Sequence, residues 1–290
     1  MSATAALAVL RYDGDRALGH DLVDPASPIL TALDLAATRG DGVFETISVG
    51  HGHPQAIDAH LARFARSAAH LDLPEPDAET WRAAVRAAAD VLGPVPESFV
   101  KTVLSRGIEG HDTPTGWAYA AVAPDHTAAR TTGIHVVLLD RGFRSDAGAT
   151  APWLLIGAKT LSYGINRAAT REAAKRGADD VVFVATDGLL LEGPTANVMI
   201  LRDGRLLTPP LDAGILPGTT QADLFAWAPS HGLEALYQPL RPQDLLDADA
   251  AWMLSSVRHA APIRAVDHAP LPVDRALSDA MNDFLRGRTS

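Results

Sequence analysis

Lysine is rare in this sequence, and its three lysines are the first residues to consider for chemistry. Of the 25 lysines and arginines in the 290-residue chain, only Lys101, Lys159 and Lys175 are lysines. Lysine is the basic side chain that can lose its proton and act as an amine nucleophile. Lys159 follows the apolar run LLIGA, so we expect it at the end of a buried strand, where desolvation lowers the pKa of a lysine.

Local sequence leaves two alternatives open for this lysine. A lysine at a strand end can also extend its ammonium into solvent. Lys101 lies on a similar predicted strand, SFVKTVLSRG, and is the competing candidate. Lys175 follows Glu172 by three positions on the polar face of a predicted helix, which is typical of surface charge.

The segment LPGTTQADLF predicts a site for an anion. Gly218 permits close approach of the backbone, and Thr219 and Thr220 offer N–H and hydroxyl donors at the start of a helix, where a phosphate is stabilised. An ordinary threonine N-cap is the alternative interpretation. Arg63, on a predicted helix, has a guanidinium that can bind a phosphate through two hydrogen bonds.

A carboxylate completes this set of groups. Glu192, in LLLEGPTAN, comes off an apolar strand into a Gly-Pro turn, which is unfavourable for a carboxylate unless a cation meets it. A lysine amine, a phosphate cradle and a buried carboxylate are together what pyridoxal 5'-phosphate (PLP) requires. The lysine binds the aldehyde, the cradle holds the phosphate, and the carboxylate keeps the pyridine nitrogen protonated.

Composition and missing motifs exclude several other kinds of protein. The chain has no cysteine and a formal net charge of -10, which argues against a thiolate site and against nucleic-acid binding. We expect a cytoplasmic protein without a membrane segment. The phosphate-binding loop GxxxxGK[ST] and the motifs HExxH, GxSxG and GxGxxG are absent. His51 and His53 lie in a Gly/Pro turn, so we expect a solvated turn and no metal site.

The elements that must position these residues alternate between strand and helix patterns. We predict strands at residues 42–50, 98–107 and 153–160, and amphipathic helices at 58–74, 79–93 and 163–177. Asp187-Gly188 and Asp203-Gly204 are typical of hairpin turns. A polar stretch near residue 128 predicts a domain boundary, with domains at 1–128 and 129–290. The class is α+β, with antiparallel hairpins rather than a doubly wound parallel sheet.

Motifs along nearly the whole chain resemble the class IV (fold type IV) PLP enzymes. This group holds branched-chain aminotransferases, D-amino-acid aminotransferases and aminodeoxychorismate lyases. The motifs are RGDGVFET, HLAR, SRG, AKTLSYGIN, GADDVVFVATDG, LEGPTANV and LPGTT, in that order. The resemblance implies a smaller N-terminal α/β domain, a larger C-terminal barrel-like domain with PLP between them, and a homodimer whose partner loops complete the substrate pocket.

The same resemblance implies roles for individual residues. Lys159 corresponds to the Schiff-base lysine and proton shuttle, and Glu192 to the partner of the pyridine nitrogen. The phosphate ligands correspond to Arg63, Thr219, Thr220 and Ser256, the last in place of a threonine that relatives often have. Tyr163, four residues after the lysine, is the candidate for the tyrosine that hydrogen-bonds the cofactor phenolate, although branched-chain enzymes align there only with a one-residue gap.

The reaction is a separate question, because lyases and aminotransferases share this machinery. KTVLSRG with its Gly-rich continuation looks more like aminodeoxychorismate lyase, and Ser255-Ser256-Val257 replaces the Gly-Thr-Ala turn of branched-chain enzymes. The D-amino-acid enzymes have an arginine and a histidine two apart where Arg106 precedes Gly107 and Ile108.

We therefore expect a 4-amino-4-deoxychorismate lyase of folate biosynthesis, which releases pyruvate and 4-aminobenzoate. Arg106 is the predicted ligand of a substrate carboxylate, with a structural arginine at a strand end as the alternative. An aminotransferase for D- or branched-chain amino acids is the second hypothesis. A cofactor-binding protein without catalysis is the third, and the presence of Lys159, Glu192 and Arg63 argues against it.

Overall fold

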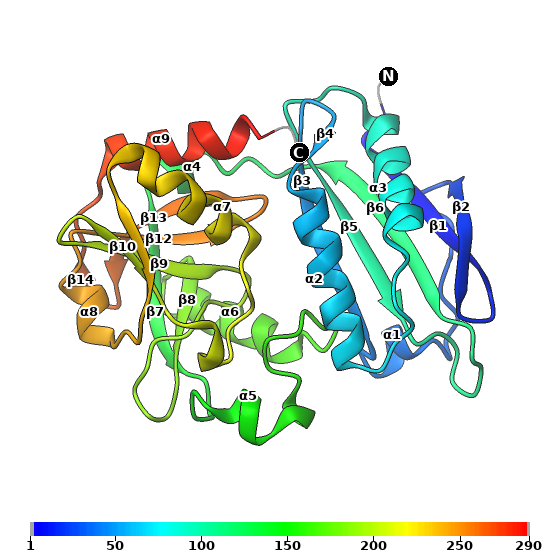
Figure 1. The fold of residues 1–290 in the computed structure, drawn as a ribbon, viewed down its shortest axis with the longest axis horizontal. Coiled ribbons are helices and arrows are strands. Elements are labelled where there is room, and N and C mark those ends of the chain that lie inside the picture. Colours follow the sequence, from blue (N-terminus) through cyan, green and yellow to red (C-terminus); the bar gives the residue numbers. More distant parts are fainter. Residues whose placement is uncertain (1–2, 289–290) are drawn as a thin grey trace. The chain divides into compact units, whose positions relative to one another are not determined.

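The structure, a computed structural model, describes residues 3–288 and divides them into two compact units (Figure 1). The first unit extends to Pro124 and also includes Ala158–Tyr163 and, at the end of the described chain, residues 287–288. The second consists of Asp125–Gly157 and Gly164–Arg286. The predicted domain division at residues 128 and 129 stays a prediction, but the segment that carries Lys159 groups with the first unit rather than with its sequence neighbours.

An antiparallel six-stranded sheet forms the first unit, in the order β2-β1-β6-β5-β3-β4. The central strands alternate buried apolar residues with more exposed ones, as expected for a sheet with one face on a core. The strands are β1 (Ala5–Asp13), β2 (Arg16–Val23), β3 (Gly42–Gly50), β4 (His53–Pro54), β5 (Glu97–Ser105) and β6 (Thr115–Val122).

Two helices cover this sheet on one side (Figure 1), α2 (Ile57–His70) against β3 and α3 (Ala78–Leu92) against β1 and β6. Asp77 caps α3, because its side chain accepts a hydrogen bond from the Thr80 N–H at 2.8 Å, and α3 ends at Gly93. The fully buried rings of Phe64 and Trp81 meet edge to face at 4.9 Å and join the two helices. A short helix, α1 (Leu35–Thr38), precedes β3.

A curled eight-stranded sheet forms the second unit, in the order β11-β10-β9-β12-β13-β7-β8, with β14 beside β13. Hairpins join β9 to β10 and β12 to β13, and Asp203 and Gly204 both have the positive φ that a two-residue hairpin turn favours. The strands are β7 (Ile134–Asp140), β8 (Asp180–Val184), β9 (Asn197–Arg202), β10 (Arg205–Thr208), β11 (Glu234–Tyr237), β12 (Ala250–Ser255), β13 (His259–Val266) and β14 (Ala269–Pro270).

Three strand pairs in this sheet are parallel, which the sequence analysis did not foresee: β7 with β8, β7 with β13, and β10 with β11. Parallel neighbours need a crossover connection. The chain supplies one through α6 (Gly164–Lys175) between β7 and β8, and another through α7 (Thr219–Trp227) between β10 and β11. The remaining helices are α4 (Thr127–Thr131), α5 (Ala147–Thr150), α8 (Pro242–Leu246) and α9 (Arg275–Arg286), with 3-10 turns at Pro152–Leu154, Leu211–Ala213 and Ala228–His231.

The predicted strand at residues 153–160 is wrong. Its first residues form the end of a 3-10 turn, and Trp153 is 75% exposed. Leu155 and Gly157 both have positive φ, which an extended strand does not allow. Among residues 3–288, no helix is both long and apolar enough to cross a membrane.

Candidate active site

Backbone hydrogen bonds fix the segment that carries Lys159 against β3 in the first unit. The Lys159 N–H donates to Ser67 Oγ on α2 at 3.1 Å, and the Lys159 carbonyl accepts from the Phe44 N–H at 3.0 Å. The Leu161 N–H donates to the Gly42 carbonyl at 2.8 Å. A Cβ at Gly42 would lie 2.6 Å from the Leu104 carbonyl oxygen and 2.7 Å from a Leu161 methyl, so this approach requires glycine.

The amine of this lysine lies over an aromatic ring. Lys159 Nζ is 4.5 Å from the centroid of the Phe44 ring, a cation–π contact, and the half-buried Tyr163 packs its ring edge-on against Phe44 at 5.3 Å. Lys101, the competing candidate, points from β5 as an exposed side chain. The structure therefore places Lys159, and not Lys101, in a partly enclosed environment.

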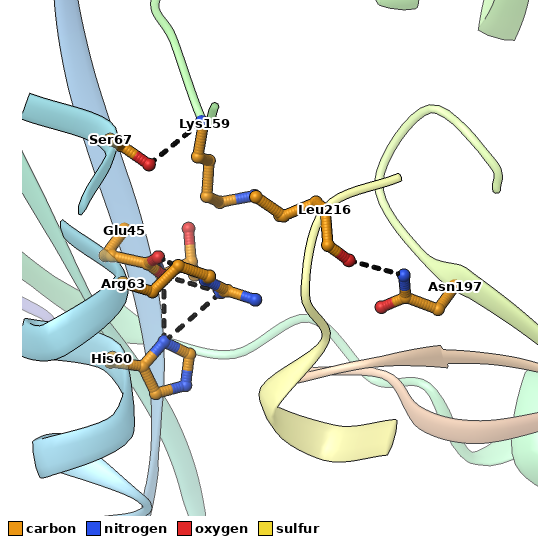
Figure 2. Close-up of polar contacts among 8 residues, drawn as sticks. Glu45, His60, Arg63, Ser67, Lys159, Asn197 and Leu216 are labelled. Atoms are coloured by element: carbon orange, nitrogen blue, oxygen red, sulfur yellow. Dashed lines mark hydrogen bonds and ion pairs between the residues drawn. The ribbon is translucent and has the colours of Figure 1, made fainter. Parts of the chain in front are cut away.

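A buried ionic cluster lies beside this segment in the first unit (Figure 2). Glu45 Oε1 accepts from Arg63 Nε at 2.6 Å, and Glu45 Oε2 accepts from Arg63 Nη2 and from His60 Nδ1, both at 2.8 Å. Glu45 is fully buried, and His60 and Arg63 are nearly so. His60, Arg63 and Ser67 are three or four residues apart on α2, so they share the helix face toward β3.

The charges of Glu45 and Arg63 offset each other in this cluster. Burial by itself would raise the pKa of Glu45, but the Arg63 guanidinium and the hydrogen bond from His60 hold that pKa far below its usual range. Burial lowers the pKa of His60, as do the charges of Arg63 and Lys159, against the opposing effect of Glu45. Histidine is therefore neutral here and donates its Nδ1 proton to an ionised glutamate.

Sequence reasoning missed Glu45, although RGDGVFET contains it. An available signal was its position: Val43, Glu45 and Ile47 alternate along β3, and all three are fully buried. An acidic residue at an inward position of an apolar strand needs a cationic partner. That partner is Arg63, whose Nε and Nη2 atoms bind the carboxylate, and its predicted role toward a phosphate stays a prediction.

Arg106 lies in a network of its own at the end of β5. Its Nε and Nη2 atoms bind the Asp41 carboxylate at 2.8 and 3.2 Å, and Nη2 and Nη1 also donate to the carbonyls of Leu71 and Asp72 at 2.6 and 3.3 Å. The ion pair is half-exposed. Its predicted contact with a substrate carboxylate stays a prediction. His51 and His53, predicted in a solvated turn, are both exposed, His51 in the turn after β3 and His53 as the first residue of β4.

In the second unit, Glu192 receives uncharged donors. Its Oε2 atom accepts from the Leu216 N–H at 3.1 Å and from Asn197 Nδ2 at 3.3 Å. Asn197, buried at the start of β9, also donates to the Leu216 carbonyl at 2.9 Å, as Figure 2 shows. Sequence reasoning missed Asn197, although an amide at the start of an apolar strand is a recognisable signal.

The start of α7 in this unit carries the three residues predicted to bind an anion, Gly218, Thr219 and Thr220. Gly218, not a threonine, is the N-cap residue and provides no side-chain cap, so the threonine N-cap interpretation is wrong. A Cβ at Gly218 would lie 2.0 Å from Asn197 Oδ1, so a larger residue there would displace the Asn197 side chain. Thr219 and Thr220 are buried, and within residues 3–288 Thr220 Oγ1 has no hydrogen-bond partner. Ser256 is half-buried in the turn between β12 and β13.

These groups fit PLP. A helix N-terminus without a side-chain cap and with an unpaired buried hydroxyl suits a phosphate. A carboxylate that an amide and a backbone N–H orient suits a protonated pyridine nitrogen as a partner. A lysine amine beside an aromatic ring suits covalent attachment of the aldehyde.

Comparisons with known proteins agree with this chemistry. Residues 42–266 match the family described as Amino-transferase class IV. A bifunctional aminodeoxychorismate lyase / D-amino acid transaminase of Mycobacterium tuberculosis is 43% identical over 265 residues, which cover 88% of this chain and 92% of that protein.

Solved structures share both fold and sequence. A fold IV-transaminase, CpuTA1, from Curtobacterium pusillum is 50% identical with a TM-score of 0.93, over 98% of each chain. The PLP-bound form of a hypothetical aminotransferase from Mycobacterium tuberculosis is 40% identical with a TM-score of 0.90, over 97% of each chain. The chain belongs to the class IV aminotransferase family and is a PLP-dependent enzyme of fold type IV.

Proposed function

We propose that this protein is a 4-amino-4-deoxychorismate lyase, which converts its substrate to 4-aminobenzoate and pyruvate for folate biosynthesis. The observation that carries the proposal is the 43% identity, across nearly the whole chain, to a relative whose name includes this lyase. The motif SRG at residues 105–107 supports it, because the sequence around it is similar to the lyase group.

Lys159 and Glu192 have separate tasks in this reaction. When bound, PLP supplies an electron sink for the negative charge that develops at the substrate carbon. Lys159 Nζ attaches the cofactor and, once released, removes the proton from the carbon that bears the substrate nitrogen. Glu192 holds a proton on the pyridine nitrogen. The enolpyruvyl group then leaves with the electrons of its bond to the ring and takes up the proton that Lys159 holds, which gives pyruvate. The ring that remains is aromatic, which makes the release favourable.

Further residues bind and orient. Thr219, Thr220, Ser256 and Arg63 bind the phosphate in this proposal, and Tyr163 donates to the phenolate oxygen of the cofactor. Arg106 binds a substrate carboxylate in exchange for Asp41, its present partner in a half-exposed ion pair. We also propose a homodimer in the cytoplasm. The large exposed side chains of Trp153, Leu154 and Ile165 support association with a second copy.

An aminotransferase is the second candidate. The 50% identity to a fold IV-transaminase favours it, and the relative from Mycobacterium tuberculosis bears both names. The two reactions share proton removal by Lys159 and differ in where the proton returns. An aminotransferase passes the amino group to a 2-oxo acid and releases no pyruvate from 4-amino-4-deoxychorismate.

One experiment separates the two. The PLP-loaded protein is mixed with enzymatically generated 4-amino-4-deoxychorismate, and 4-aminobenzoate and pyruvate are measured together. We expect both products in equal amounts. Absence of both from a protein that retains its bound cofactor would overturn the lyase. A panel of D- and L-amino acids with 2-oxoglutarate or pyruvate would then test the aminotransferase, which fails if no new 2-oxo acid forms.

A further inference from the structure

A three-residue turn in the second unit carries Ser256, one of the phosphate ligands of the proposed function, on which this inference rests. Ser255 and His259 pair across the hairpin of β12 and β13, which leaves Ser256, Val257 and Arg258 in the turn. His259 has a φ of 62°, in the left-handed region that residues other than glycine seldom adopt. Such a conformation persists only where surrounding contacts hold it.

Arg130 supplies contacts of this kind from outside the hairpin. It lies on α4, more than a hundred residues earlier in the sequence, and only 5% of it is exposed. Its Nε atom donates to the Arg258 carbonyl at 3.0 Å, and its Nη2 atom donates to the Val257 carbonyl at 2.9 Å. A peptide unit is planar, so a fixed carbonyl also fixes the N–H that follows it. One guanidinium therefore sets two successive peptide planes, those that follow Val257 and Arg258, beginning one residue after Ser256.

An ion pair with β8 also holds this turn. Arg258 Nη2 donates to Asp180 Oδ2 at 2.5 Å, and Asp180 is buried at the start of β8. The other Asp180 oxygen accepts from the Val181 N–H at 2.9 Å, which fixes the carboxylate. The side chain of Arg258 and the two carbonyls of the turn are thus anchored to two separate elements, α4 and β8.

We infer that Arg130 is a positioning residue for phosphate binding: by holding the Val257 and Arg258 carbonyls it fixes the turn that presents Ser256 to the phosphate of PLP. Burial of an arginine against backbone carbonyls is costly unless its hydrogen bonds are made in full. A methionine of similar length would fill the space and leave both carbonyls without this donor. The turn would then sample other conformations, and Ser256 would meet the phosphate less often.

The test uses two ligands that differ only in the phosphate. Apoprotein is titrated with PLP and with pyridoxal, and binding is followed by tryptophan fluorescence. The measured quantity is the ratio of the two Kd values. In R130M we expect the preference for PLP to fall about tenfold, with pyridoxal binding nearly unchanged, since a hydrogen bond to a charged group is lost. R130K, which keeps the charge but not the two-pronged geometry, should lie between R130M and the wild type.

Controls separate positioning from general loss of structure. R264M removes a half-exposed arginine on β13 that lies outside the turn, and it should leave the ratio unchanged. S256A should lower the ratio by itself, and R130M should add little to it, because residues that act through one contact are not additive. An unchanged ratio in R130M, or an equal loss for both ligands, would overturn the inference.

The remaining outcomes are also decisive. If S256A leaves the ratio unchanged, the assignment of Ser256 in the proposed function is wrong, and that failure is visible whatever R130M does. If R130M does not fold, R130Q keeps one donor for the carbonyls and takes its place. Failure of R130M, R130K and R130Q to fold would assign Arg130 to the stability of the unit and overturn its role in positioning.

Discussion

Glu45 lies on β3 of the first unit and Glu192 in the loop before β9 of the second, and the partners of their carboxylates differ. Glu45 is met by the guanidinium of Arg63 and by His60, so its charge is balanced inside the first unit. Glu192 accepts from an amide and a backbone N–H, donors without net charge. The fully buried Glu45 is held by a guanidinium, whereas the half-buried Glu192 is oriented by an amide and a backbone N–H. In the proposed function, Glu45 serves mainly the stability of its unit and Glu192 serves the cofactor.

Replacement of Lys159, on which the proposed reaction depends, should have the largest effect. K159A should lower turnover by at least about a thousandfold and abolish the visible absorbance of covalently bound cofactor, because the chain loses its nucleophile and proton acceptor. Steady-state assays and absorbance spectra measure both effects. K101A is the matched control, and it should keep activity and spectrum. Retention of either property in K159A would move the assignment to Lys101.

Removal of the charge on Glu45 should act mainly on stability. E45Q leaves the guanidinium of Arg63 buried without its anion, and the free energy of unfolding should fall by about 3–5 kcal/mol. Urea unfolding of the apoprotein at pH 7 measures the change. A D58N variant removes an exposed carboxylate from α2, the helix that carries Arg63, and it should change the free energy of unfolding by less than about 1 kcal/mol. Unchanged stability in E45Q would show that the cluster is not structural.

The same cluster predicts acid lability of the wild type. The pKa of Glu45 is lowered on folding, so the unfolded chain binds more protons, and stability falls with falling pH. The contribution of Glu45 is complete above about pH 4.3, the value for an unfolded glutamate, and is lost below it. The lowered pKa of His60 adds a loss that begins below about pH 6.5. The free energy of unfolding, measured at stepped pH, should therefore depend less on pH in E45Q than in the wild type below about pH 4.3.

The equivalent change at Glu192 should act on catalysis instead. E192Q keeps the shape but loses the negative charge, and kcat should fall about a hundredfold, because a protonated pyridine nitrogen loses its charged partner. The free energy of unfolding of the apoprotein should change far less than in E45Q. Steady-state kinetics and urea unfolding of the two variants, measured side by side, sharpen the comparison. Equal losses of stability in E45Q and E192Q would break it.

The smallest effect is expected at the unpaired hydroxyl of Thr220. T220V removes a buried polar atom without a partner among residues 3–288, so the apoprotein should be no less stable. Affinity for PLP should nevertheless fall about tenfold, since a hydrogen bond to the phosphate is lost. Thermal unfolding of the apoprotein and titration with PLP measure the two quantities. A loss of stability with unchanged affinity would place Thr220 with Glu45 as a structural residue.

Local sequence predicted the elements whose residues interact with near neighbours. The strand at Gly42–Gly50, the helices α2 and α3, and the Asp203-Gly204 hairpin follow from alternation, helical spacing and turn residues, and the structure confirms them. The strand predicted at residues 153–160 failed because composition alone did not show the left-handed turn at Leu155. The parallel pairs depend on crossovers that join distant segments, which local patterns do not encode.

The candidate site shows the same limit. The positions of Lys159, Glu192, Thr219 and Thr220 were predicted, because motifs mark them. The partners Glu45 and Asn197 were not, since a hydrogen bond between β3 and α2, or between a loop and β9, depends on tertiary structure. Buried polar residues within apolar strands are a signal that would have found both.

The placement of Ala158–Tyr163 has a consequence for how the protein is made. During synthesis the sheet of the first unit can form once residue 122 has left the ribosome, but β3 receives the lysine segment only about forty residues later, at rates of roughly 5–20 residues per second. A fragment that stops at Pro124 would contain Glu45, His60 and Arg63 and no lysine at the site. Catalytic competence is therefore acquired late, after the scaffold that receives it.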